Sequence, residues 1–231
     1  MSAMKKLANE AALIAKLRAE TYQWFAQMFS QELDKEIIKI YQDGALNTMF
    51  NLFGEIGLSI EVDRFKEAIA QLASLENPAL ELKADFAACF LLDEASGAMP
   101  YASLYLNEEG MMYSEAERKM RELLSKSGLA ILESFKEPSD HLAIYLSLMH
   151  KWCEQLHKEI KKEVDTQSYL HNEYLAQKSF VDNGILMWIP SWNNRLARIT
   201  NCKTDFYQAL GALLMAFLLA DSDFLANELL A

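Results

Sequence analysis

Glycine and proline are scarce in this chain, which contains only 8 glycines and 4 prolines among 231 residues. A fold of many short strands needs turn-forming residues about every 8–12 positions, far more often than these two residues occur here. Apolar residues make up 52% of the sequence, and they recur mostly at the three- and four-residue spacing of a helix face. We therefore predict an all-α fold, a helical bundle of about ten helices with short connections.

The longest predicted helix runs from Pro138 to about Glu163. A proline fits the first turn of a helix, because the amide that it lacks would have no partner there. A later predicted helix, Ile185–Thr200, is interrupted by Pro190. One face of the longest helix follows the i, i+3, i+4, i+7 spacing of a buried stripe: Leu142, Tyr145, Leu146, Met149, Trp152 and Leu156.

Two segments break the helical pattern. The segment Asp93–Gly110 has no sustained helical period and contains Gly97, Pro100 and Gly110. We predict a long ordered loop there, and loops of this length in compact domains are often functional. The second segment, Leu129–Glu137, is a connector. Composition divides the chain at this connector into an N-terminal helical part, residues 1–130, and a C-terminal helical part, residues 138–231.

The chain is acidic, with 33 Asp and Glu against 22 Lys and Arg and a net charge of −11. Such a charge repels phosphate backbones and anionic lipid headgroups. We therefore expect no nucleic-acid partner and no membrane insertion. A basic peptide is a partner that this charge would attract, although solubility alone also accounts for it.

The cysteines and the apolar stretches indicate where the protein works. Cys89, Cys153 and Cys202 lie far apart, and the sequence has no C-x-x-C motif. This pattern predicts a reducing compartment without a disulfide framework. The stretch Ala11–Ala15 is too short for the core of a signal peptide. The longest apolar stretch, Phe206–Ala220, is shorter than the roughly 20 residues of a membrane span, so we expect a cytoplasmic protein.

General catalytic signatures are absent from the sequence. It contains no glycine loop for phosphates, no G-x-S-x-G and no H-E-x-x-H motif. His150, Cys153 and His157 share one side of the longest helix and are ligand types that zinc accepts. One helix cannot easily direct three ligands to one tetrahedral centre, and no fourth ligand is evident. We predict that this stripe is a half-exposed helix face with a buried thiol and binds no metal.

Three places stand out against the helical background. Asp85 is the only charged residue in the apolar run 84–92, so it either reaches solvent at the edge of the stripe or receives a cation such as arginine. Tyr101 and Tyr105 in the long loop can line a peptide groove or pin the loop to the core. The proline and the acidic residues of the segment Glu137–His141 suit the start of a helix. A helix start does not by itself explain the presence of His141.

These places together resemble one known family. Glu137–His141 matches the E-P-x-D-H signature of the TorD/DmsD family of redox-enzyme maturation chaperones. Pro100–Tyr105 is similar to that family's Y-x-S-x-Y loop, and Asp85 falls in the corresponding A-D-F segment. Trp24–Leu33 resembles the family's first helix. The likeness covers most of the chain in the same order and is strongest to TorD-type members, which serve trimethylamine-N-oxide reductase.

The resemblance implies a chaperone and not an enzyme. Members are all-helical, with two parts joined by a hinge near the E-P-x-D-H motif, and TorD-type members form domain-swapped dimers through that hinge. They bind the twin-arginine signal peptide and the apo form of a molybdoenzyme, and they assist insertion of molybdopterin guanine dinucleotide before export. The resemblance also implies weak guanine-nucleotide binding, for which this sequence has no motif; we expect no stably bound cofactor.

The residues that match the family's peptide-recognition motifs form the candidate site. Their carboxylates would bind the two arginines of the leader, and the tyrosine rings would receive its apolar stretch. The residues are Asp85, Tyr101, Ser103, Tyr105, Glu137, Pro138, Asp140 and His141.

Three other functions fit parts of the sequence. A related chaperone of the DmsD or nitrate-reductase type would serve another molybdoenzyme. A nucleotide hydrolase would use Asp140 and His141 in catalysis. A helical adaptor would have no peptide groove at all.

Overall fold

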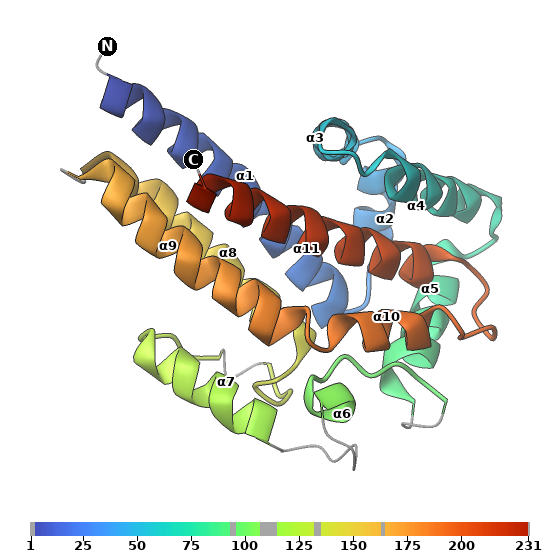
Figure 1. Cartoon of the computed structure of the whole chain (residues 1–231). Helices are drawn as coiled ribbons and strands as arrows, with labels where there is room; N and C mark the ends of the chain where they lie inside the picture. Colours follow the sequence, from blue (N-terminus) through green and yellow to red (C-terminus); the bar gives the residue numbers. More distant parts are fainter. Residues whose placement is uncertain (1–2, 93–95, 107–114, 132–134, 163–164, 231) are drawn as a thin grey trace. The chain divides into compact units, whose positions relative to one another are not determined.

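The computed structural model describes residues 3–92, 96–106, 115–131, 135–162 and 165–230. Within these ranges the chain is helical, and the only β-type pairing is an isolated bridge. The prediction of an all-α fold is confirmed. Figure 1 labels the α-helices, which are α1 (Ala3–Ser30), α2 (Lys35–Gln42), α3 (Asn47–Glu55), α4 (Ser59–Gln71), α5 (Pro78–Phe86), α6 (Ser103–Leu106), α7 (Glu115–Lys126), α8 (Leu142–Glu159), α9 (Thr166–Phe180), α10 (Ile189–Leu196) and α11 (Phe206–Leu230).

Two helices begin at other residues than the sequence predicted. Helix α8 begins at Leu142 and not at Pro138, because His141 is extended (φ −68°, ψ 138°) and its ring caps the helix. Pro190 does not interrupt a helix but lies in the first turn of α10, where a missing amide costs nothing. The residues before it, Val181–Ile185, form a π-helical turn that continues α9.

The chain forms two compact units, each built from segments that are distant in the sequence. Unit 1 comprises Met1–Phe29, Tyr101–Met187 and Asp221–Ala231, and unit 2 comprises Ser30–Pro100 and Trp188–Ala220. These boundaries differ from the predicted division at 129–137, and the hinge there stays a prediction.

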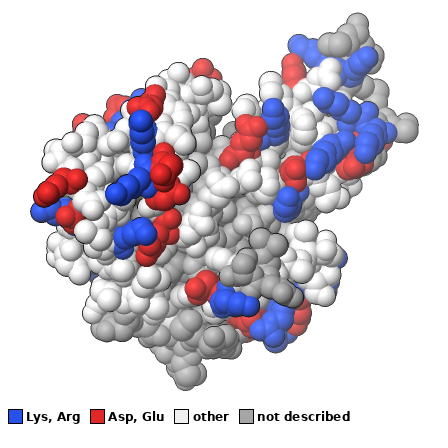
Figure 2. Space-filling model, turned by 180° about the vertical axis from the view of Figure 1, so that it is seen from behind, with Lys and Arg blue, Asp and Glu red and all other residues white. Residues whose placement is uncertain are grey.

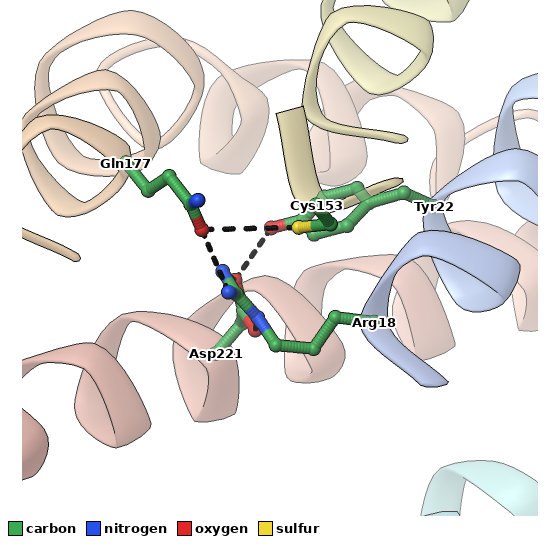
Figure 3. Close-up of polar contacts among 5 residues, drawn as sticks. All are labelled: Arg18, Tyr22, Cys153, Gln177 and Asp221. Carbon is green, nitrogen blue, oxygen red and sulfur yellow. Dashed lines mark hydrogen bonds and ion pairs between the residues drawn. The ribbon is translucent and has the colours of Figure 1, made fainter. Parts of the chain in front are cut away.

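The core of unit 1 contains a buried ion pair between two helices from opposite ends of the chain. Arg18 of α1 donates to both carboxylate oxygens of Asp221 in α11, from Nε at 2.6 Å and from Nη2 at 2.9 Å. The hydroxyl of Tyr22 donates to the same carboxylate at 2.7 Å, and Arg18 Nη1 donates to Gln177 Oε1 of α9 at 2.7 Å. Figure 3 shows these side chains converging, with the Cys153 thiol of α8 also directed to Gln177. The network therefore joins the four long helices of unit 1.

Burial makes this network depend on pairing. Arg18 is 6% exposed and Asp221 is 5% exposed. Burial lowers the pKa of Arg18, but the charge of Asp221, the interactions with Cys153 and Tyr22 and the hydrogen bond to Asp221 together outweigh this and hold that pKa well above its ordinary value. The guanidinium therefore stays charged, and neither ion can be removed without leaving the other unpaired in the core.

The core of unit 2 is aromatic. Phe206 packs against Phe65 with ring centroids 5.0 Å apart, and Tyr207 packs edge-on against Phe90 at 5.3 Å. Gly211 lets α10 approach α11 closely, because a Cβ atom there would lie 2.6 Å from Leu196 Cδ2. This close approach explains a glycine in the middle of a long helix, where it otherwise weakens the helix.

Helix α11 has the length and composition of a membrane span, and no other helix in the described part of the chain does. Its apolar window is 56% buried inside the fold. The helix supplies Phe206 and Tyr207 to the core of unit 2 and Asp221 to the network of unit 1. A mostly buried core helix passes the same test of length and composition, so we interpret α11 as a core helix.

We expect Arg18→Met to lower the free energy of unfolding by about 3–5 kcal/mol, because it leaves the Asp221 carboxylate buried without its charge partner. Arg64 provides a matched control, since it also makes a two-pronged contact, to Asp205 at 2.7 and 2.8 Å. Those side chains are 44% and 42% exposed, so Arg64→Met should cost less than about 1 kcal/mol. Urea unfolding of both variants measures the difference, and equal losses would contradict the argument.

Candidate functional site

The turn before α8 is fastened to the loop that leads into α6. Tyr101 and His141 pair in an antiparallel bridge, and the amide of Ala102 donates to the carbonyl of Asp140 at 3.0 Å. The amide of Ser103 donates to Asp140 Oδ2 at 2.9 Å. Asp140 thus holds the first turn of α6 with both its backbone and its side chain. We call this arrangement of residues 101–103 with 137–141 the clasp.

Aromatic contacts complete the clasp. The hydroxyl of Tyr101 donates to Glu137 Oε2. The ring of Tyr101 lies edge-on to His141 with centroids 5.2 Å apart, and Phe135 lies edge-on to the same imidazole at 5.3 Å. The structure therefore brings Tyr101, Glu137 and His141 together and directs them at one another.

His141 is held as a neutral imidazole. Its Nδ1 accepts a hydrogen bond from the amide of Ala143 at 3.1 Å, so this nitrogen carries no proton while it caps α8. The side chain is buried, and burial lowers the pKa of His141 to about 4. A neutral acceptor suits the amide groups at a helix start.

Asp140 is 0% exposed. Its Oδ1 and the Oγ of Ser103 have no hydrogen-bond partner within the described residues. Burial, and then the charge of Asp140, raise the pKa of Tyr145 on the first turns of α8. A guanidinium cannot reach this carboxylate while the clasp is closed. In the observed conformation Asp140 therefore positions the chain and is not open to a peptide.

Asp85 has a different role from the one predicted. It lies in unit 2, whereas the other seven predicted residues lie in unit 1. Its Oδ1 accepts from the amide of Lys203 at 2.7 Å, and its Oδ2 accepts from the amide and hydroxyl of Thr204 at 2.8 and 2.7 Å. The side chain is 3% exposed. Asp85 thus fixes the turn before α11, and its oxygens are occupied by donors of the chain itself.

The remaining predicted residues are partly accessible. Tyr105, Glu137 and Pro138 are half-buried, whereas Tyr101 and Ser103 are buried. Of the three carboxylates predicted to receive arginines, only Glu137 keeps a partly exposed side chain. The clasp therefore explains the motif as a positioning device, and it offers little open surface of its own.

A groove in unit 1 lies against the clasp. Its volume is about 560 Å³, and it runs between α7 on one side and α8 and α9 on the other. Leu106 of α6 and Tyr145 of α8 belong to its wall, and they lie three and four residues after the clasp residues Ser103 and His141. The wall also contains the large apolar side chains of Met120, Leu123, Trp152, Phe180 and Met187. We call it the α7 groove.

Stacked aromatic rings form the floor of the α7 groove. Phe180 lies 5.7 Å from Tyr145 with its ring nearly parallel, and 6.3 Å from Trp152. The indole of Trp152 donates to Glu173 at 2.7 Å, which fixes its orientation. A second hollow of about 550 Å³ shares Leu123 and Trp152 with the groove and extends it along α8. The two hollows together suit an extended or helical apolar segment.

Charged side chains line both hollows. Glu115 pairs with Lys119 at 2.8 Å in the α7 groove, with both side chains more than half exposed. Glu154 pairs with Lys151 and Lys158 at 3.1 and 2.9 Å in the second hollow, and hydrogen bonds from these lysines lower the pKa of Glu154 to about 2. Figure 2 shows that basic side chains lie beside acidic ones on one face of the molecule.

The predicted metal-like stripe on α8 packs against α1. His150 Nδ1 hydrogen-bonds the carbonyl of Ala19 at 3.0 Å, and His157 Nδ1 hydrogen-bonds that of Ala12 at 2.6 Å. Cys153 between them is buried. In the described part of the chain, no group of three His, Cys, Asp or Glu side chains is arranged to hold a metal ion.

Sequence reasoning missed the α7 groove. Its wall comes from four helices, and helical periodicity cannot tell which faces of different helices meet. The exposed apolar side chains Leu106 and Met187 are a weak signal of such a surface, but their exposure is itself a structural property.

Known proteins resemble this chain over almost its whole length. A family model described as the nitrate reductase delta subunit matches residues 57–194, a range that contains the clasp and the α7 groove. The chaperone protein TorD of Actinobacillus pleuropneumoniae serotype 7 (strain AP76) is 35% identical over 215 residues, covering 93% of this chain and 99% of that protein. TorD of Aliivibrio fischeri (strain ATCC 700601 / ES114) is 33% identical, with 95% and 100% covered. TorD of Vibrio atlanticus (strain LGP32) is 30% identical, with 91% and 95% covered.

The buried His141 makes stability depend on pH. Its pKa of about 4 in the folded protein lies below the ordinary 6.5, so the unfolded chain binds more protons between these values. This part of the stability is complete above pH 6.5 and falls as the pH drops toward 4. From pH 7 to pH 5 the loss should be about 2 kcal/mol.

The substitution His141→Asn should remove this loss, because asparagine can cap α8 but does not titrate. Urea unfolding at pH 7 and pH 5 measures the change for the wild type and the variant. The exposed His171 gives the control, and His171→Asn should keep the wild-type dependence. A full loss between pH 7 and pH 5 in His141→Asn would contradict the assignment.

Proposed function

The chain belongs to the family of chaperones that includes TorD, and on this premise we propose that it matures an exported molybdoenzyme in the cytoplasm. It binds the twin-arginine leader and the apo form of the client, and it assists insertion of the molybdenum cofactor before export. Trimethylamine-N-oxide reductase is the proposed client. The prediction that the chain is a chaperone and not an enzyme is confirmed by its membership of this family.

The observation that carries the peptide-binding part of this proposal is the α7 groove. A leader peptide contains an apolar stretch, and the groove offers aromatic and methionine side chains over a length that the second hollow extends. Methionine adapts its shape to different apolar partners, and rigid aromatic rings supply contact area at little entropic cost. The groove therefore suits a leader whose exact apolar residues vary.

The clasp contributes by placing the groove walls. It fixes α6, which carries Leu106, and the start of α8, which carries Tyr145. Asp140 and His141 act in this proposal through α6 and α8 and need not touch the peptide. Asp85 is not part of the proposed peptide site, because its carboxylate is buried against Lys203 and Thr204.

Carboxylates around the hollows would bind the two arginines. Glu115 and Glu154 are held only by exposed lysines, and such pairs contribute little to stability. Exchange of a lysine for a guanidinium, which can bind a carboxylate through two hydrogen bonds, is therefore inexpensive. We keep Glu137 as a third acceptor for the arginines. Its side chain is half-buried and accepts a hydrogen bond from the hydroxyl of Tyr101.

The resemblance also supplies the cofactor and dimer proposals. The chain would handle molybdopterin guanine dinucleotide only through its client and hold no cofactor stably. Weak guanine-nucleotide binding and a homodimer swapped through the connector 129–137 stay predictions.

One other client has a specific observation in its favour. The matched family model carries the name of a nitrate reductase subunit, so a nitrate reductase is the alternative client. Titration with synthetic leaders of the two reductases separates these clients by affinity. The nucleotide hydrolase considered from the sequence is disfavoured, because Asp140 is 0% exposed and His141 is 5% exposed and both are engaged in the clasp.

We expect Met187→Glu to weaken binding of the leader peptide about tenfold, because it places a charge in the wall that receives the apolar stretch. Met187 is 62% exposed, so the fold should tolerate the change. Leu80 is 61% exposed on α5 of unit 2, and Leu80→Glu is the matched control with little effect expected. Calorimetric titration with a synthetic leader measures both affinities. An unchanged affinity in Met187→Glu, or an equal loss in Leu80→Glu, would count against the groove.

A further inference from the structure

Unit 2 brings two cysteines into contact that are far apart in the sequence. The sulfur atoms of Cys89 and Cys202 lie 3.4 Å apart. Cys89 is in the π-helical turn Ala87–Leu91 that continues α5, and Cys202 is in the segment before α11. Cys89 is 0% exposed, whereas Cys202 is partly exposed. Of the two residues, only Cys202 is therefore partly exposed to solvent.

A second contact fixes the same two segments. Asp85, one helical turn before Cys89, accepts hydrogen bonds from the amides of Lys203 and Thr204, the residues that follow Cys202. The backbone on both sides of the thiol pair is thus held in place. The sulfurs lie 3.4 Å apart, so they need to approach by only about 1.3 Å to reach the S–S distance of a disulfide.

The two thiols differ in acidity. The hydrogen bond with Cys202 raises the pKa of Cys89, and burial adds to this increase. The hydrogen bond from Cys89 lowers the pKa of Cys202 despite its partial burial, and a hydrogen bond with Gln208 adds to this decrease. The nearby carboxylate of Asp85 raises the pKa of both. The thiolate therefore forms more readily at Cys202, the partly exposed residue of the pair.

We propose that Cys89 and Cys202 form a redox-modification site, which hydrogen peroxide converts into a disulfide within the chain. The Cys202 thiolate attacks one peroxide oxygen, the O–O bond breaks, and Cys202 becomes a sulfenic acid while the other oxygen leaves as water after protonation. Cys89 then attacks the sulfenic sulfur, forming the S–S bond and releasing a second water. Two thiols lose two electrons and two protons, and the peroxide is reduced to two waters.

The disulfide would fasten α5 to the start of α11 inside unit 2. Cys153 takes no part, since it lies in unit 1 and is buried. Burial raises the pKa of the Cys153 thiol to about 12. This site does not include any residue of the α7 groove, so the result of its test does not depend on the proposed function.

The test uses the full reduced chain and hydrogen peroxide. We expect the number of free thiols, counted in the denatured protein, to fall from three to one. The mass of the intact chain should fall by two hydrogen atoms, and a proteolytic fragment should join Cys89 to Cys202. Dithiothreitol should restore all three thiols. Accumulation of sulfinic acid at Cys202 with Cys89 still reduced, or disulfides only between chains, would overturn the proposal.

Three variants separate the roles of the thiols. In Cys89→Ser, dimedone should trap a sulfenic acid at Cys202 and no internal disulfide should form. In Cys202→Ser, Cys89 should remain reduced under the same treatment. Cys153→Ser is the matched control and should form the disulfide at the wild-type rate. A Cys89 that oxidises as fast in Cys202→Ser as in the wild type would show that Cys202 is not the attacking residue.

Discussion

A carboxylate that is removed from water must be given hydrogen-bond donors, and this requirement decides how the helices meet within each unit. Asp221 takes Arg18 and Tyr22 as donors and so joins the two ends of the chain in unit 1 (Figure 3). Asp85 takes two backbone amides before α11, and Asp140 takes the amide of Ser103 before α6. Each buried acid is placed where segments distant in the sequence have to be fixed, because removing one partner would leave the other uncompensated.

The same requirement explains the structural role of the E-P-x-D-H segment, Glu137–His141. In the clasp, Asp140 and His141 accept hydrogen bonds from amides of the chain itself, and their burial keeps them out of reach of a ligand. What they position is a groove whose floor is formed by Tyr145, Phe180 and Trp152. The division between positioning residues and contact residues is the core of the account.

The sequence predicted the elements better than their meeting points. Helical periodicity and the scarcity of glycine and proline were sufficient for the all-α fold, and the motif singled out Tyr101, Glu137 and His141. Periodicity cannot show that Asp85 meets residues 203 and 204, or that Cys89 meets Cys202, because those contacts join segments more than 100 residues apart. The predicted start of α8 was wrong, because a histidine that caps a helix through its ring cannot be recognised from the spacing of apolar residues.

The most direct measurement is photo-crosslinking of a leader peptide that carries benzoyl-phenylalanine in its apolar stretch. The account predicts crosslinks to residues of the α7 groove, foremost Met187, Leu123 and Phe180, with mass spectrometry identifying the sites. It also predicts that an excess of unlabelled leader suppresses them. Crosslinks confined to α5 around Asp85, or none on α7, α8 and α9, would contradict the claim that the clasp positions a peptide groove in unit 1.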